Sequence, residues 1–249
     1  MTTVIEALAH TVPALAAMRW NWSLQDLERL VVAAGRTYRA PSEGNVSCDF
    51  GAGAGAFLFG DEVTAVWLSL VARPTPAPVL ARRDAFAAAV DVVTGLLGPP
   101  ATPHPGPDPS AGWPVASGVL EVVDKPGALD LWLRPGPRRT AYPRNVVDLE
   151  SAPTWADLEA GLADAAASLP AGTVVWLTDD LVLSQAADRL TVTIGGTTRV
   201  LAWPARGADY AELATDLVIW LRDEAGHRSP EELSYRSDLP IWHLPLRRA

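Results

Sequence analysis

The segment Asn45–Val71, NVSCDFGAGAGAFLFGDEVTAVWLSLV, decides how the rest of the chain is interpreted. Its alternation of apolar and small residues predicts three strands. The strands are interrupted by the glycine run Gly51–Gly55 and by a turn at Gly60–Asp61. Helical patterns flank the segment on both sides, so the sequence predicts an α+β fold.

The glycine run invites comparison with a phosphate-binding loop. Such a loop leads a strand into a helix N-terminus, where backbone N–H groups meet the anion. Here the run leads into Ala56–Phe59, which is strand-like, and no Lys-Ser/Thr pair follows it. The sequence therefore favours a structural role, in which the glycines let the chain bend or let another backbone come close.

Composition and charge exclude some classes of partner. The 249 residues are 49% hydrophobic and carry a formal net charge of −9. Nucleic acid is not expected as a partner, because neutralising phosphates requires a basic face. After Glu150 the chain has 14 acidic and 8 basic residues, so the second half is the more acidic and the better suited to attract a basic partner.

The cellular compartment is predicted from the single cysteine and from the absence of signal-peptide and membrane-spanning patterns in the sequence. Cys48 is the only cysteine, so no disulfide forms within one chain. The N-terminus has no basic region before its apolar residues and carries Glu6, which is not typical of a secretory signal. No apolar run is long enough to cross a bilayer. We expect a cytoplasmic protein with no membrane partner.

Residues 1–140 are predicted to form the first of two domains. Between Pro99 and Pro114 the chain is rich in proline and lacks periodicity, which predicts an extended, exposed connection or, as an alternative, a short polyproline II ligand. The predicted helices are 2–18, with an interruption at Pro13, 23–34 and 79–97. The predicted strands are 37–40, 45–50, 56–60, 63–71, 115–123 and 129–134, the last two joined by a turn at 125–127.

A linker at 141–153 precedes the second domain, residues 154–249. Thr154 with Asp157 predicts a capping box, and Gly226 is expected just after a long helix at 208–225. Strands are predicted at 173–178, 181–187 and 190–194, with a further strand or a crossing at 198–203, and Ser229 begins a short helix. Each domain is therefore expected to be an antiparallel sheet of three to five strands flanked by helices.

No pattern of residues predicts catalysis. The four histidines are not at metal-ligand spacing from one another or from Cys48, and the local signatures of serine hydrolases and zincins are missing. Asp179 and Asp180 form an adjacent carboxylate pair, for which a polar turn is the favoured interpretation. We therefore predict no catalytic residue, no metal site and no cofactor.

Candidate protein-binding residues are the tryptophans outside amphipathic patterns, together with polar groups of the second half. Tryptophan in such positions is typical of an interface anchor, although a contact inside the chain would explain it equally well. The candidates are Trp20, Trp22, Asp179, Asp180, Trp203, Tyr235 and Trp242.

The second half contains VVWLTDDLVLSQAADRLTVTI, then a Trp-Pro pair, then DYAELATDLVIWLRDEAGHRSPEELSY. With these runs, residues 154–240 resemble the actinobacterial domains grouped as type III secretion chaperone-like. The sequence departs from that pattern between Gly195 and Pro204, where the chain is shortened. The first half, with Trp-x-Trp at 20–22, Asp-Phe-Gly at 49–51 and Leu-Gly-x-Pro at 97–100, is similar to an actinobacterial domain family of unknown function.

The resemblance implies a non-enzymatic, chaperone-like protein or an immunity protein that neutralises a toxin. Its partner would be another protein, a secreted effector or toxin, and a homodimer is compatible with this hypothesis. The alternative is a small-molecule-binding protein or an enzyme whose site lies between the two domains, near the glycine run and Asp49.

Overall fold

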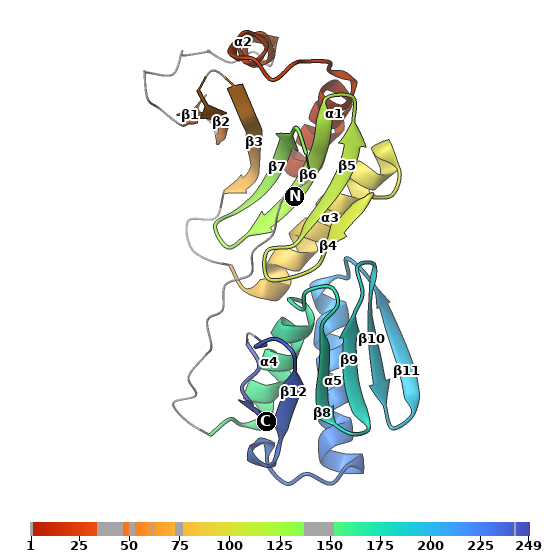
Figure 1. Ribbon diagram of the computed structural model, residues 1–249. Coiled ribbons are helices and arrows are strands. Elements are labelled where there is room, and N and C mark those ends of the chain that lie inside the picture. The colour runs from red at the N-terminus through yellow and green to blue at the C-terminus, as the bar shows by residue number, and fades with distance from the viewer. Residues whose placement is uncertain are drawn as a thin grey trace. The chain divides into compact units, whose positions relative to one another are not determined.

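The computed structural model describes residues 2–33, 47–49, 53–60, 62–72, 77–136, 152–241 and 243–249 (Figure 1). Its contacts divide the chain into two units, which are described separately below. The first unit comprises Met1–Pro76, Ala88–Pro103 and Ser110–Arg139, and the second comprises Ala77–Ala87, His104–Pro109 and Thr140–Ala249. The short segments 77–87 and 104–109, which the sequence places in the first domain, thus make their contacts in the second unit.

The described residues form an α+β fold with five α-helices and two mainly antiparallel sheets, as the sequence predicts for the fold class. The sheets have seven and six strands, more than the three to five expected for each domain. No described helix is both long enough and apolar enough to cross a membrane.

The first sheet has the strand order β1-β2-β3-β7-β6-β5-β4, and all pairings given for it are antiparallel. Helices α1 and α3 lie behind it in Figure 1. The helices that contribute to this unit are α1 (Thr2–Ala17), α2 (Leu24–Ala33) and the later part of α3 (Val79–Leu97), and the strands are β1 (Ser47–Asp49), β2 (Ala54–Phe59), β3 (Glu62–Ala72), β4 (Thr102–His104), β5 (Ser110–Val115), β6 (Gly118–Lys125) and β7 (Ala128–Arg134).

Side chains alternate between the two faces of this sheet, as strand geometry requires. On one face Leu120, Val122, Leu131 and Leu133 are fully or almost fully buried and form the apolar core. Trp113 shares this face and donates from Nε1 to the carbonyl oxygen of Gly98, just after α3, over 2.8 Å. The opposite face is polar and aromatic.

The prediction of an exposed connection between Pro99 and Pro114 is wrong. The stretch forms β4 and most of β5, and Pro105, Pro109 and Ser110 are buried. Proline is tolerated at sheet edges and strand starts, where no ladder N–H is needed, so proline density did not prevent strand formation here. A free polyproline II ligand is not what this stretch forms.

The second sheet has the strand order β11-β10-β9-β8-β12-β13, and α4 and α5 cover one of its faces (Figure 1). The helix α5 continues into a π-helical turn, η1, before Gly226 with its positive φ of 77°. The elements are α4 (Trp155–Ala166), β8 (Val174–Thr178), β9 (Leu181–Gln185), β10 (Arg189–Ile194), β11 (Thr197–Ala202), α5 (Gly207–Ile219), η1 (Trp220–Glu224), a 3-10 turn η2 (Pro230–Glu232), β12 (Ser234–Ser237) and β13 (Arg247–Arg248).

The predicted helix start at Thr154 is confirmed. The Thr154 hydroxyl accepts from the Asp157 backbone N–H, and the Asp157 carboxylate accepts from the Thr154 backbone N–H. These two bonds satisfy donors that a helix N-terminus otherwise leaves free. The Thr154 hydroxyl also donates to the Asp157 carboxylate, over 2.6 Å. This bond and the one from the Thr154 backbone N–H lower the pKa of Asp157, because both favour its charged form.

The strand β11 ends the order of the second sheet. Its Arg199 points to the helix side of the sheet, where the guanidinium pairs with Glu212 at 2.9 Å and with Asp216 at 2.5 Å, both on α5. The sequence left this segment open as a strand or a crossing, and the structure shows a strand. A charged residue facing inward is one way in which proteins protect a sheet edge.

Candidate functional site

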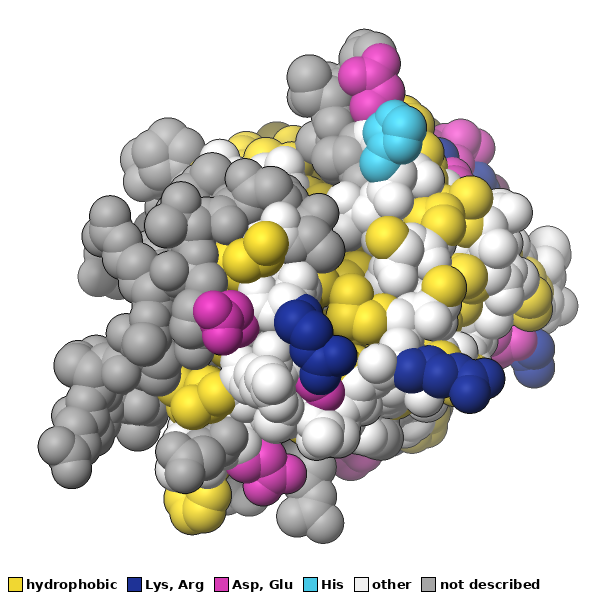
Figure 2. All heavy atoms as spheres, turned by 90° about the horizontal axis from the view of Figure 1, so that it is seen from above, with side chains coloured by type: hydrophobic (Ala, Val, Ile, Leu, Met, Phe, Trp, Pro, Cys, Tyr) yellow, Lys and Arg dark blue, Asp and Glu magenta, His cyan; other side chains and the backbone are white. Residues whose placement is uncertain are grey.

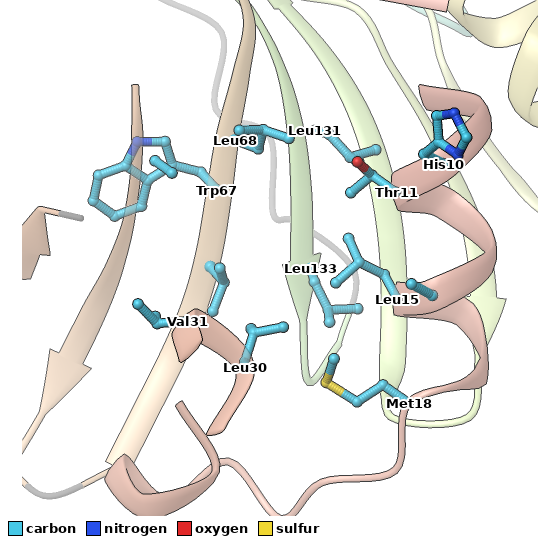
Figure 3. A pocket seen from close by; sticks show the side chains of 13 residues that line it. His10, Thr11, Leu15, Met18, Leu30, Val31, Trp67, Leu68, Leu131 and Leu133 are labelled. Atoms are coloured by element: carbon cyan, nitrogen blue, oxygen red, sulfur yellow. The ribbon is translucent and has the colours of Figure 1, made fainter. Parts of the chain in front are cut away.

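An apolar pocket of about 360 Å³ lies in the first unit, between α1, α2 and the core face of the sheet (Figure 3). This volume is within the range of small-molecule sites, roughly 300–1,000 Å³. Thirteen residues line it: His10, Thr11, Ala14, Leu15, Met18, Leu30, Val31, Ala54, Val66, Trp67, Leu68, Leu131 and Leu133.

Helical and strand periodicity explain why these residues meet. On α1 the lining residues fall at spacings of one, four and five from His10, which is one stripe of a helix, and Met18 follows directly after the helix. On the strands, Val66 and Leu68 of β3 and Leu131 and Leu133 of β7 are two residues apart, so each pair faces the same side of the sheet. Trp67 contributes differently, since its ring points away from α1 in Figure 3.

The pocket reaches the surface along α1. His10 and Ala14 are exposed, whereas Val31 and Leu133 at the opposite wall are buried. His10 and Thr11 are the polar side chains among the lining residues, and both stand at one end of the stripe (Figure 3). Figure 2, which views the protein from above, shows hydrophobic side chains reaching this surface among polar ones. The arrangement can hold an apolar group.

A second cluster occupies the opposite face of the same sheet. Strand register places one residue from each of five strands in a row across it: Gly55, Trp67, Trp132, Glu121 and Gly112. The register extends the row to Asp49 on β1. Gly55 and Asp49, far from Glu121 in the sequence, thus belong to one row of the sheet.

Aromatic rings and charges fill the middle of that row. The rings of Phe57, Trp67 and Trp132 lie 4.7 to 5.9 Å apart. Lys125 Nζ and Arg134 Cζ each lie 4.3 Å from the Trp132 ring, within the range of cation–π attraction. The Trp132 ring is therefore already in contact with two cationic side chains of this chain, Lys125 and Arg134.

Two buried carboxylates complete the cluster. Asp130 accepts from the Ser69 hydroxyl at 2.8 Å and from Lys125 at 3.1 Å. Glu121 is fully buried and lies 3.6 Å from Arg134, and its Oε1 accepts from the Ser110 hydroxyl at 3.4 Å. Such pairing is what keeps buried charges tolerable, so we interpret the cluster as structural.

The open face of the second sheet is a third candidate. One row across it contains Arg236, Trp176, Val182, Thr193 and Thr198, and a second contains Val174, Ser184, Thr191 and Val200. The alternate residues face the helices and form the core of this unit. Trp176 is 38% exposed and Val200 is 54% exposed, so this face presents apolar surface bordered by hydroxyl groups.

The comparisons with known proteins bear on the first unit. A family model with the description "Family of unknown function (DUF6301)" matches residues 6–134, which is just over half of the chain. The chain belongs to the DUF6301 family. No curated protein and no solved structure matches the chain.

The DUF6301 region ends at Arg134, the last residue of β7. All thirteen residues of the apolar pocket lie inside it, and so does the polar cluster from Gly55 to Arg134. The open face of β8–β11 lies outside it. The pocket is therefore a feature of the part of the chain that defines the family.

Two of the predicted binding residues lie in the DUF6301 region and contact each other. The rings of Trp20 and Trp22 are 4.4 Å apart, and Trp22 is buried. Trp22 donates from Nε1 to the Ser117 carbonyl oxygen at 2.9 Å, and its own carbonyl accepts from Val63. The Trp-x-Trp motif thus ties the link between α1 and α2 to the sheet of the same unit.

The predicted residues of the second unit are dispersed. Asp179 is 93% exposed and pairs with Arg236 at 2.9 Å, and Asp180 is exposed in the turn after β8. Trp203 packs against Phe86 with ring centres 5.6 Å apart. Tyr235 is buried, and its hydroxyl accepts from the Ile241 N–H. Trp242 lies outside the described residues.

Sequence reasoning missed the residues that line the pocket and the exposed Trp176. The pocket residues look like ordinary helix and strand core positions, so only their meeting in space distinguishes them. For Trp176 a signal existed, since it alternates with the buried Val175 and Leu177 and hence faces the wet side of a strand. Among the described residues, no three His, Cys, Asp or Glu side chains lie close enough to hold a metal ion.

Proposed function

We propose that this protein is a non-enzymatic protein-binding module that holds its partner on the open face of the second sheet. The observation that carries the proposal is the exposure of Trp176 and Val200 on that face. Of the nine residues in its two rows, Arg236 is the one with a charge. Interface cores are depleted in charge and enriched in aromatic residues, so this composition suits protein docking.

The resemblance of residues 154–240 to secretion-chaperone-like domains supports the nature of the partner. The order α4, four meandering strands, α5 agrees with the helix, strands, helix plan expected of such a domain. A chaperone-like or immunity protein would act in the cytoplasm on a secreted effector or toxin. The family match neither names a partner nor argues against one.

Charge suggests how the partner approaches. The residues after Glu150 include 14 acidic and 8 basic side chains, so the second half is acidic overall. A basic partner would be attracted over a distance of about 8–10 Å at physiological salt. Its association rate should therefore fall with added salt, while dissociation, governed by the apolar face, changes little.

The experiment is capture of the partner with the tagged full-length chain from its native cytosol, identification by mass spectrometry, and calorimetry with the purified partner. Trp176→Ala should weaken binding by about thirtyfold, the effect of losing an aromatic hot spot. Val200→Asp should also weaken it, because it places a charge within the buried contact.

Phe59→Asp provides the matched control. Phe59 is 80% exposed and apolar like Val200, but it lies in the first unit. It should leave the affinity unchanged. The proposal fails if no partner is recovered in stoichiometric amount, or if the recovered partner binds Trp176→Ala as tightly as the wild type.

A further inference from the structure

The apolar pocket of the first unit extends along α1. Its lining residues run from His10 on α1 to Met18, which follows the last residue of the helix, eight residues further on. At 1.5 Å of rise per residue this stripe is about 12 Å long. The three backbone bonds of an extended residue span about 3.3–3.6 Å, so an extended chain of single bonds advances about 1.2 Å per bond. About ten such bonds therefore fit along the stripe.

The wall of the pocket suits an unbranched alkyl chain. Leu15, Leu30, Leu68 and Leu131 approach from both helices and from two strands, and no Asp, Glu, Lys or Arg is among the described residues that line the pocket. A bulky polar ligand would leave hydrogen-bonding groups unsatisfied against this wall. Flexible Met18 stands at the end away from His10 and can adapt to chain length (Figure 3).

The polar groups gather at one end. His10 and Thr11 both line this end of the pocket, so an imidazole N–H and a hydroxyl are available there as donors. His10 is exposed, which leaves the charge of such a group in contact with water. A carboxylate accepts several hydrogen bonds and suits this end.

We propose that the pocket binds a free medium-chain monocarboxylic acid, with its alkyl chain along α1 and its carboxylate at His10 and Thr11. This site is separate from the protein-binding face, which lies in the second unit. A protein side chain is the rival occupant, but a single side chain would not fill a stripe about 12 Å long.

The test is calorimetry on the full chain with sodium salts of straight-chain acids from hexanoate to tetradecanoate, each below its micellar concentration. Affinity should rise about fourfold for each added methylene, the value of burying one CH₂, up to about ten carbons. Beyond that length it should level off, because further carbons leave the pocket. Absence of saturable one-to-one binding for any acid would overturn the proposal.

Two exposed alanines of α1 supply a matched pair of variants. Ala14 lines the pocket, whereas Ala9 does not. Ala14→Phe should fill the space and abolish decanoate binding, while Ala9→Phe should bind as the wild type does. Thermal unfolding of both variants checks that they fold. Equal decanoate affinities of two folded variants would refute the site.

The carboxylate end is tested by an isosteric change. Thr11→Val should weaken decanoate binding about tenfold, since a hydrogen bond to a charged group is lost. Binding of decanol, which lacks the charge, should be nearly unchanged. If the variant weakens the acid and the alcohol equally, the head group does not lie at Thr11 and the proposed orientation is wrong.

Discussion

The guanidinium of Arg83 donates a hydrogen bond from Nε to the carbonyl oxygen of Ala167, over 2.8 Å. Arg83 lies on α3 and is 2% exposed, and Ala167 is the C-cap of α4. The same guanidinium donates to Gly106 and Pro107 through Nη2. A cation at a helix C-terminus satisfies free carbonyls and opposes the negative end of the helix dipole. These contacts join the segments 77–87 and 104–109 to α4 within the second unit.

Replacing Arg83 should be costly. Arg83→Met leaves several buried carbonyl oxygens without their donor, so we expect the free energy of unfolding to fall by roughly 3 kcal/mol or more. Arg83→Lys should recover part of this loss, since it keeps the charge without the fork of donors. Arg228→Met is the control, because Arg228 is exposed, and should change stability by less than about 0.5 kcal/mol. Urea unfolding measures all three; comparable losses for Arg83→Met and Arg228→Met would contradict this account.

Two helical glycines should respond in opposite directions to alanine. A Cβ on Gly161 of α4 would lie 2.3 Å from Pro245 and 2.5 Å from the His243 carbonyl oxygen, so Gly161→Ala should destabilise by about 1–3 kcal/mol. Gly95 of α3 has no atom within 4 Å of that position, so Gly95→Ala should stabilise by up to about 1 kcal/mol. Thermal unfolding distinguishes the signs; stabilisation by both would show that the C-terminal segment does not pack on α4.

Buried and exposed ion pairs should also differ. Glu121→Ala removes a fully buried carboxylate and leaves Arg134 without that partner, which should cost roughly 3–5 kcal/mol. Asp188→Ala breaks the exposed pair with Arg189 and should cost less than about 1 kcal/mol. Chemical denaturation of both variants at one salt concentration measures the two losses in the free energy of unfolding. A loss below about 1 kcal/mol for Glu121→Ala would mean that the buried ion pair does not stabilise the first sheet.

Asp164 gives a pH dependence of known sign. Burial raises the pKa of its carboxyl group, with nearby His243, Arg83 and Arg82 opposing the shift. The folded state therefore holds this proton more tightly than the unfolded state, and its contribution to stability decreases as pH rises from the ordinary value of 3.8 through the raised value. Asp164→Asn should flatten this part of the stability profile. An unchanged slope above pH 3.8 in the variant would exclude Asp164 as its source.

Turns, helix starts and glycine positions could be predicted from short runs of sequence. The turn at Pro126–Gly127 joins β6 and β7, and the pair Thr154 and Asp157 begins α4, as the sequence indicates. Gly53 has a positive φ of 72°, and a Cβ there would lie 3.0 Å from the Ser69 Cβ, which confirms close approach at that glycine. Each of these depends on residues near one another in the chain.

Non-local pairing explains what the sequence could not predict. Strand β12 pairs with β8 across some sixty residues, as Arg236 opposite Trp176 illustrates, and no local pattern encodes that choice. The apolar pocket likewise joins His10 to Leu133, and each lining residue would serve equally well as ordinary core. The row from Gly55 to Glu121 becomes visible only once strand register is known.

The inward-facing Arg199 on β11 affects how the protein behaves at high concentration. A free strand edge is a template on which further chains can add, and repeated addition leads to fibrils. Any chain that lengthened the sheet beyond β11 would have to accommodate a guanidinium clamped by Glu212 and Asp216 of α5. The ion pairs therefore oppose extension of the sheet beyond β11 and with it the growth of fibrils from this edge.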